Sequence, residues 1–226
     1  MRIGIKIANK WIGNEKPCFV IAEAGVNHNG SFRLAKKMVD VAKDAGVDAV
    51  KFQAFTAEQV VTKAAEKALY QKRMTGGGSQ YEMLKKLELT EDEFSKLAAH
   101  AKRKNIIFLA SAFDKRSVDM LEGLKVPAFK IPSGEITNFL LLKHIARKRR
   151  PIILSTGMST LGEIAEALEI IKGEGANEII LLHCVSDYPA KAEDMNLKAI
   201  DTLKHAFGLQ LGSPITHLAS PFRSRR

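Results

Sequence analysis

Two lysines in the sequence stand where an ammonium group could hold a phosphate. Lys51 and Lys130 each end an apolar, strand-like run that starts with an alanine two residues earlier. A single lysine in such a place often only extends its amine to solvent from the rim of a sheet. Two at equivalent places, with the hydroxyls of Ser133 and Ser155 in the neighbouring segments, favour a phosphate site made of ammonium groups and hydroxyls. Schiff-base chemistry is the other use of a buried lysine, and the spacing leaves it open.

Two carboxylates accompany the lysines. Glu23 ends an apolar run, and Glu135 follows the Pro132–Gly134 segment just beyond Lys130. Carboxylates at the mouth of a site act as general bases or contact sugar hydroxyls. Glu135 could equally lie in the first turn of a helix and only complement the helix dipole. The spacing leaves both interpretations open.

The histidines and the glycine-rich segment carry weaker signals. His28 lies in the polar, turn-like segment Val26–Gly30, and His183 lies within an apolar run, where a hydrogen-bonded core histidine is expected. The two histidines do not have the spacing of metal ligands. Gly76–Gly78 lacks the Lys-Ser/Thr pair of a P-loop, so we interpret it as a loop.

Strand-like and helix-like segments must position these residues, and they alternate along the chain. Six βα units follow one another, and the strands are continuous apolar runs, which is typical of a parallel sheet buried on both faces. Thr90 with Glu93 three residues later forms a capping box for one of the helices. The expected strands are 18–23, 49–53, 106–110, 128–131, 151–155 and 178–183. The expected helices begin near 31, 90, 115, 138, 160 and 196.

The first of these helices is predicted in most detail. Ser31 is its expected N-cap, and Leu34, Met38, Val41 and Ala45 recur at the spacing of one helix face. These four side chains are therefore expected to share one face of the helix, which Gly46 ends.

Regular βα repetition gives either a closed barrel or a doubly wound sheet. No G-x-G-x-x-G motif follows the first strand, which disfavours the dinucleotide-binding option. Barrel enzymes place their active sites at the carboxyl ends of the strands. Polar side chains recur at those ends: Glu23, Lys51, Ser111, Lys130, Ser155 and Ser186. The predicted fold is an α/β (β/α)₈ TIM barrel that is incomplete, with about six βα units over residues 18–211.

Length and composition fit such a domain. The 226 residues fall short of the roughly 250 of a complete barrel. Residues 1–17 are expected to form a short hairpin that turns at Gly13–Asn14. No apolar run is long enough to span a bilayer. Cys18 and Cys184 lie in apolar runs and are predicted to be packed thiols in a cytoplasmic protein rather than a disulfide.

The net charge of +10 allows several partners. The basic residues are dispersed, and two of the clusters, 102–104 and 147–150, end expected helices, where cations complement the dipole. No aromatic residues interleave with them, so nucleic acid is disfavoured as a partner. An anionic small substrate, or simply solvated helix faces, explains the charge equally well.

Read together, the segments resemble the sialic acid synthase family. Five stretches carry the resemblance in family order, one for each of five barrel units: Ile21–Gly30, Val50–Gln53, Phe129–Glu135, Leu154–Met158 and Leu182–Cys184 with Tyr188–Pro189. The resemblance implies a cytoplasmic enzyme, a homodimer when intact, that condenses phosphoenolpyruvate with an N-acetylated amino sugar and releases phosphate. It also implies a divalent metal, Mn²⁺ or Mg²⁺. The N-acetylneuraminate and N,N'-diacetyllegionaminate branches match better than the pseudaminate branch, but which acetamido sugar is used, and whether it is phosphorylated, stays open. Another phosphoenolpyruvate-dependent sugar-acid synthase is the alternative.

The resemblance assigns roles to individual residues. The carboxylates of Glu23 and Glu135 are implied to be catalytic. The residues implied to bind phosphoenolpyruvate are Lys51, Gln53, Ser111, Lys130, Ser133 and Ser155. The sugar-binding positions are Phe113, Ser186 and Tyr188. Ser111 stands where relatives often have threonine, which keeps the hydroxyl. Ser186 stands where some relatives have asparagine, so the sugar preference is open at this position.

Residues 212–226 depart from the family pattern. Relatives continue after Leu211 with Gly-Leu-Ser-Asp-His-Thr-Leu-Gly, which includes a histidine that binds the metal, and a second metal histidine follows on the eighth strand. Codons compatible with residues 212–226, read in another frame, encode this continuation. We therefore expect a single-base deletion near the codon of Gly212, genomic or from sequencing, and an inactive chain without the metal histidines. His217 is not expected to replace them. Missing strands would also leave sheet edges exposed.

Overall fold

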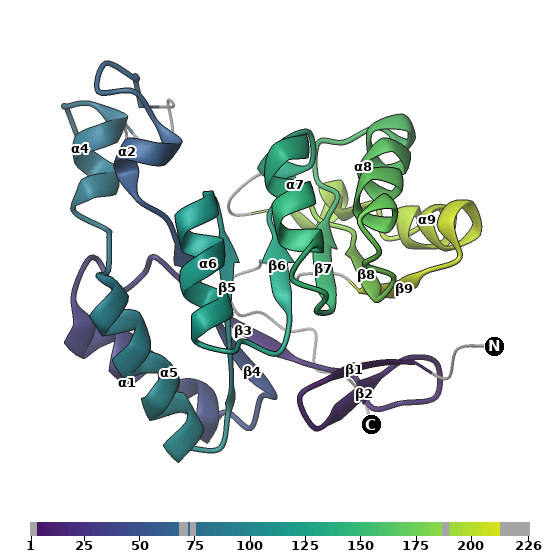
Figure 1. Cartoon of the computed structure of the whole chain (residues 1–226), viewed down its shortest axis with the longest axis horizontal. Coiled ribbons are helices and arrows are strands. Elements are labelled where there is room, and N and C mark those ends of the chain that lie inside the picture. The colour runs from purple at the N-terminus through teal and green to yellow at the C-terminus, as the bar shows by residue number, and fades with distance from the viewer. Residues whose placement is uncertain (1–3, 68–71, 73–75, 187–189, 213–226) are drawn as a thin grey trace.

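The computed structural model describes residues 4–67, 72, 76–186 and 190–212. Its main element is a sheet of seven parallel strands that neighbour one another in chain order (Figure 1). The strands are β3 (Ile21–Gly25), β4 (Ala49–Ala54), β5 (Ile107–Ala112), β6 (Phe129–Ile131), β7 (Ile152–Ser155), β8 (Ile179–Leu182) and β9 (Gln210–Gly212). The first six correspond to the six predicted strands. The seventh, β9, pairs with β8 through Leu181 and Leu211, so Gly212 belongs to the sheet rather than to the predicted tail.

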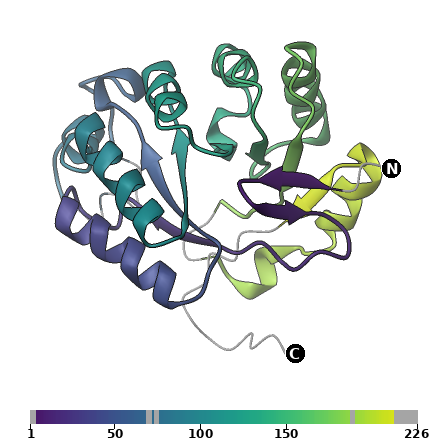
Figure 2. The ribbon, with the colours of Figure 1, turned by 60° about the horizontal axis from the view of Figure 1, so that its bottom comes forward.

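The sheet curls into part of a barrel, and helices lie around its outer side (Figure 2). The longer helices are α1 (Phe32–Asp44), α5 (Glu91–Arg103), α6 (Lys115–Gly123), α7 (Phe139–Ala146), α8 (Leu161–Gly173) and α9 (Ala199–Phe207). Two short helices, α2 (Ala57–Val60) and α4 (Gln80–Lys85), lie in the long connection after β4. The predicted fold class, an incomplete α/β barrel with an N-terminal hairpin, is confirmed.

Both faces of the sheet are buried, as the apolar strands predict. Side chains such as Phe52, Phe108 and Phe129 point outward into the core shared with the helices. The alternate residues, such as Ala49, Leu109 and Ile153, point inward and pack under the hairpin. Because side chains alternate along a strand, one continuous apolar run supplies both layers.

The helices begin where local signals place them. Ser31 accepts a hydrogen bond from the backbone of Leu34 and caps α1. Thr90 and Thr160 each form a complete capping box, at the start of α5 and α8. The last helix differs from the prediction, because Asn196 has a left-handed backbone at the end of a short 3₁₀ turn (η2, Ala192–Met195), and α9 starts three residues later.

The N-terminal hairpin forms, but its turn is not at Gly13–Asn14 as predicted. Strands β1 (Ile5–Ile7) and β2 (Lys10–Ile12) pair in antiparallel fashion around a two-residue turn at Ala8–Asn9. Ala8 takes a positive φ of 53°, as tight hairpin turns require. Gly13–Asn14 lies in a second turn, after β2. The inner face of β1 fills the amino-terminal end of the barrel, with Ile5 and Ile7 both buried.

The apolar face predicted for α1 is not the face that the helix buries most deeply. Ala35, Val39 and Ala42 are buried, whereas Leu34 and Val41 are 38% and 57% exposed. The exposed apolar face lines a groove of about 410 Å³ beside β3. β3 is an edge strand among the described residues, so the groove runs along an open side of the partial barrel. The helix has two apolar faces, and periodicity alone did not distinguish them.

The tail predicted from the sequence lies mostly outside the described residues, which end at 212. In the described part of the chain, no helix combines the length and the apolar character that a membrane span needs.

Candidate functional site

The predicted site residues gather at the carboxyl ends of the strands, on the inner face of the sheet. Ala49 and Leu109 form part of the inner apolar layer. Two residues further along the same strands the side chains are polar, namely Lys51 on β4 and Ser111 on β5. The period-2 alternation of a strand therefore places a polar layer directly above the apolar floor of the barrel.

Strand register brings this layer together. Gln53 on β4 pairs with Ser111 on β5, and Ser111 pairs with Lys130 on β6, so the three residues form one row across the sheet. Glu23 on β3 pairs with Lys51 on β4, two residues closer to the amino end of β4 than Gln53. A hydrogen bond of 3.3 Å from Lys51 Nζ to Ser111 Oγ joins the two rows.

Lys51 is held by an ion pair. Its buried ammonium group contacts the carboxylate of Glu23, whose side chain is 45% exposed. Glu23 therefore neutralises one of the two lysines from the open side of the site. Gly25, two residues on, has a φ of +53°, and a Cβ there would lie 3.0 Å from Glu23 Oε1. Glycine thus leaves the carboxylate room to reach the lysine.

Lys130 lies deeper and has no described carboxylate partner. Its Nζ donates a hydrogen bond of 2.7 Å to the carbonyl of Ile131. Burial, and then the nearby charge of Lys51, lower the pKa of Lys130 to about 7, while Cys184 and Glu23 oppose the shift. A buried amine with this pKa changes its charge near neutral pH. The site can thus offer either an ammonium group for an anion or a neutral amine for a nucleophilic reaction.

The remaining predicted anion ligands flank the row. Ser155 is buried at the end of β7. Ser133 opens a 3₁₀ turn, η1 (Ser133–Glu135), directly after β6. Glu135, at the end of that turn, accepts a hydrogen bond of 2.8 Å from the Asn138 side chain. The position of Glu135 agrees with both interpretations, since it lies in a helical turn and also at the carboxyl end of the sheet.

The predicted sugar positions are only partly brought together. Phe113 follows β5 and packs edge-on against Phe55, with ring centroids 6.3 Å apart. Ser186 lies beyond β8, beside the loop that follows β7. Tyr188 lies outside the described residues.

Neither histidine singled out in the sequence is a described metal ligand. His183 lies just past β8 rather than inside it, and its Nε2 is 2.9 Å from the carbonyl of Met195. His28 is buried in a turn, where Nδ1 accepts a bond from the Gly30 amide and Nε2 has no partner among the described residues. Burial lowers the pKa of His28. Over 4–67, 72, 76–186 and 190–212, no group of three or more His, Cys, Asp or Glu side chains could hold a metal ion.

The thiols differ from the prediction that both are packed. Cys18 is exposed, because β3 begins only at Ile21. Cys184 is partly exposed at the end of β8, and its Sγ accepts a hydrogen bond of 3.1 Å from the Gly157 amide. Sequence reasoning gave Cys184 no role in the site. The sequence did offer a signal: Cys184 lies two residues past the end of a strand, and the lysines were identified by their position at strand ends.

The fold and the site define a class of protein: a parallel βα barrel, incomplete among the described residues, with two lysines and several hydroxyls at the carboxyl ends of its strands. Comparison with known proteins gives the family. Residues 38–214 match the model of the NeuB family. The chain belongs to this family.

Individual relatives agree with the assignment. An N,N'-diacetyllegionaminic acid synthase of Campylobacter jejuni is 50% identical over 200 residues, which cover 87% of this chain and 60% of that protein. The human N-acetylneuraminate-9-phosphate synthase is 35% identical over 198 residues, covering 88% of this chain and 55% of that protein. A crystal structure of the N-acetylneuraminic acid synthetase of Leptospira borgpetersenii superposes with a TM-score of 0.81 at 37% identity, covering 92% of this chain and 68% of that one. This chain spans about 55–60% of the length of these two curated relatives.

Proposed function

We propose that this protein binds phosphoenolpyruvate between Lys51 and Lys130 and condenses it with an N-acetylated amino sugar, N-acetylmannosamine or a diacetamido hexose. The products are a nonulosonic acid of the sialic type and inorganic phosphate. The carrying observation is the convergence of the two buried lysines on Ser111, which hydrogen-bonds to Lys51 and pairs in register with Lys130.

The ligand chemistry fits this arrangement. Phosphoenolpyruvate carries a phosphate and a carboxylate, and charge-assisted hydrogen bonds to ammonium groups are the strong contacts for both. The hydroxyls of Ser111 and Ser155 add donors beside the lysines. Relatives named as synthases of legionaminic and neuraminic acids support the sugar class.

The chain's own residues suggest their roles in the reaction. Carbon C3 of phosphoenolpyruvate attacks the aldehyde of the open-chain sugar, forming the new C–C bond. The positive charge that develops at C2 would be stabilised by a carboxylate, Glu23 or Glu135. Water then adds at C2, and the bond from C2 to the phosphate oxygen breaks. Lys51 and Lys130 would hold the departing phosphate.

Some features remain predictions from the resemblance. A divalent cation, Mn²⁺ or Mg²⁺, would polarise the sugar aldehyde when bound. A homodimer and a cytoplasmic location are likewise predictions.

A specific observation favours a second chemistry. Lys130, with a pKa of about 7, would be partly a neutral amine at physiological pH and could form a Schiff base with a keto acid. Borohydride added in the presence of pyruvate would trap such an adduct. A covalent pyruvyl group on Lys130 would replace the condensation mechanism with an aldolase-type one.

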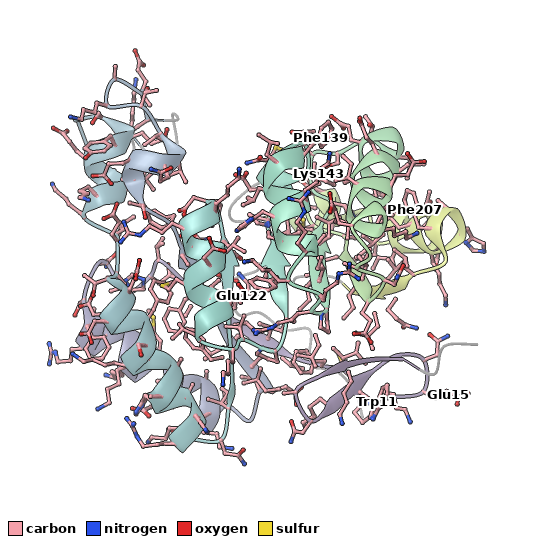
Figure 3. All side chains as sticks on the ribbon, viewed as in Figure 1. Trp11, Glu15, Glu122, Phe139, Lys143 and Phe207 are labelled. Carbon is pink, nitrogen blue, oxygen red and sulfur yellow. The ribbon has the colours of Figure 1, made fainter. Side chains whose placement is uncertain are left out.

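Binding tests the proposal directly. Titration calorimetry with phosphoenolpyruvate should detect binding by the chain, and Lys51→Ala should weaken it by about 30-fold or more, because losing a charged contact costs roughly 2–4 kcal/mol. Lys143→Ala is the matched control, since Lys143 is exposed on the outer helix α7 (Figure 3). Equal affinity in the Lys51 and Lys143 variants would refute the phosphate site.

A turnover assay with Mn²⁺ tests the second substrate. It uses a version of the protein in which the family continuation after Leu211 is restored, because the chain of 226 residues is itself expected to be inactive. Phosphate release with N-acetylmannosamine or a diacetamido hexose supports the proposal. Release with erythrose 4-phosphate or arabinose 5-phosphate, but with no acetamido sugar, would assign the site to another sugar-acid synthase.

A further inference from the structure

The loops that follow β7 and β8 are fastened together at the rim of the candidate site. The backbone and the side chain of Thr156 both donate hydrogen bonds to the Leu182 carbonyl, at 3.0 and 3.2 Å. One residue further, the Gly157 amide donates to Cys184 Sγ at 3.1 Å. Three hydrogen bonds thus hold the segment that carries Ser155 against the end of β8.

Close packing makes this contact specific. A Cβ added at Gly157 would lie 2.6 Å from Ser186 Oγ and 2.9 Å from Cys184 Sγ. Real Cβ atoms do not approach other atoms so closely, so the loop passes here only because residue 157 has no side chain. The sulfur therefore sets how near the two loops come.

The sulfur also belongs to the surroundings of the buried lysine. Cys184 favours a higher pKa of Lys130, against the larger opposite effects of burial and of Lys51. Among the described residues, the titratable groups that influence Lys130 are Lys51, Glu23 and Cys184. Glu23 is ion-paired with Lys51, whereas Cys184 is bound to the β7 loop through the Gly157 amide.

We propose that Cys184 is a positioning residue of the phosphoenolpyruvate site. Its sulfur fixes the β7 loop, and with it Ser155. The inference rests on the proposed function, because it assigns Cys184 to the same anion site. It adds a residue to which sequence reasoning gave no role.

The chain allows a clean test because it contains two cysteines. Cys18→Ser removes the exposed thiol and serves both as the background and as the matched control, since the same kind of substitution is made away from the site. Cys184→Ala and Cys184→Ser are then compared in this background. Affinity for phosphoenolpyruvate is measured by calorimetry from about pH 6 to about pH 9.

We expect affinity in the background protein to fall as the pH rises through about 7, because Lys130 loses its proton. Cys184→Ala should weaken binding about fivefold or more at neutral pH, because the segment that carries Ser155 loses its hydrogen bond to the sulfur. Cys184→Ser should recover most of the affinity, because a hydroxyl can still accept the Gly157 amide. Affinity that stays unchanged in Cys184→Ala, or that falls equally in Cys184→Ala and Cys184→Ser, would overturn the inference while leaving the proposed function intact.

A second measurement does not depend on the ligand. Hydrogen exchange of the segment 155–157 is compared in the background protein, in Cys184→Ala and in Cys184→Ser. The Gly157 amide donates to the sulfur, so exchange should be several-fold faster in Cys184→Ala and close to the background rate in Cys184→Ser. Equal exchange in all three would overturn the inference even if the background protein binds no phosphoenolpyruvate, a result that by itself would refute the proposed function.

Discussion

Replacing Lys130 by methionine should stabilise the free protein while abolishing its affinity for anions. Methionine has a similar length and no charge, so it fills the space of the lysine without a desolvated ammonium group. In the folded protein the amine has a pKa of about 7, against an ordinary value of 10.5. The unfolded chain therefore binds more protons than the folded chain between these two values, and stability rises with pH across that window.

The size of the effect follows from the two pKa values. Below pH 7 the full unfavourable contribution of Lys130 is present, roughly 5 kcal/mol. It falls to roughly 2 kcal/mol near pH 9 and vanishes above about 10.5. The variant also loses the hydrogen bond to the Ile131 carbonyl, which offsets about 1 kcal/mol of the gain. We therefore expect Lys130→Met to gain roughly 4 kcal/mol at about pH 6.5 and roughly 1 kcal/mol at about pH 9.

Urea unfolding of both proteins at the two pH values measures this difference. Lys143→Met is the matched control: Lys143 is exposed on α7, and its replacement should change the free energy of unfolding by less than about 0.5 kcal/mol. A gain that is the same at both pH values would show that the lysine is not held in a low-pKa state. A loss of stability at both would mean that Lys130 stabilises the fold, contrary to the reasoning.

Three further predictions concern the helix face, a glycine and the coupling of binding to protons. Val39→Ala should lower the free energy of unfolding by about 2 kcal/mol and Val41→Ala by less than about 0.5 kcal/mol, because only Val39 is buried; equal losses in denaturant titrations would restore the predicted face. Gly30→Ala should lower the melting temperature clearly more than Gly208→Ala. Both glycines have a positive φ, but only at Gly30 would a Cβ clash with a backbone oxygen, that of Lys86 just after α4. Equal melting temperatures would contradict this. At about pH 8, phosphoenolpyruvate binding should take up close to one proton as Lys130 recharges, seen by calorimetry in buffers of different ionisation enthalpy; no buffer dependence would exclude this coupling.

The sequence predicted the barrel because its signals are local and repeated. Each strand is a continuous apolar run, and each of the helices α1, α5 and α8 starts at a side chain that caps it, as Thr90 and Thr160 do with complete capping boxes. These signals need no knowledge of distant residues. The fold class then predicted that Lys51 and Lys130 lie at the same, carboxyl end of the sheet, and the register places them in neighbouring rows.

The errors arose where the answer depends on neighbours in space. Helix α1 has two apolar faces, and the contact with α5 and the sheet, not periodicity, buries Val39 rather than Val41. The hairpin turn was placed at Gly13–Asn14 by turn propensity, but the pairing of Ile5 with Ile12 puts it at Ala8–Asn9. Cys18 was interpreted as buried because its neighbours are apolar, although the strand starts three residues later.

The charge state of the site could not be predicted from the sequence either, and it shapes the chemistry. The charge of Lys51 disfavours the charged form of Lys130, and among the described residues the carboxylate of Glu23 is ion-paired with Lys51 alone. In the free protein the amine of Lys130 is therefore partly uncharged at neutral pH, and its burial lowers the stability of the fold. Functional sites commonly lower stability in this way. An anion with two charged ends would compensate both lysines at once, so its binding would charge Lys130 and remove the destabilisation together. The cost of charging Lys130 in the free protein would therefore strengthen the preference of the site for a multiply charged ligand over a singly charged one.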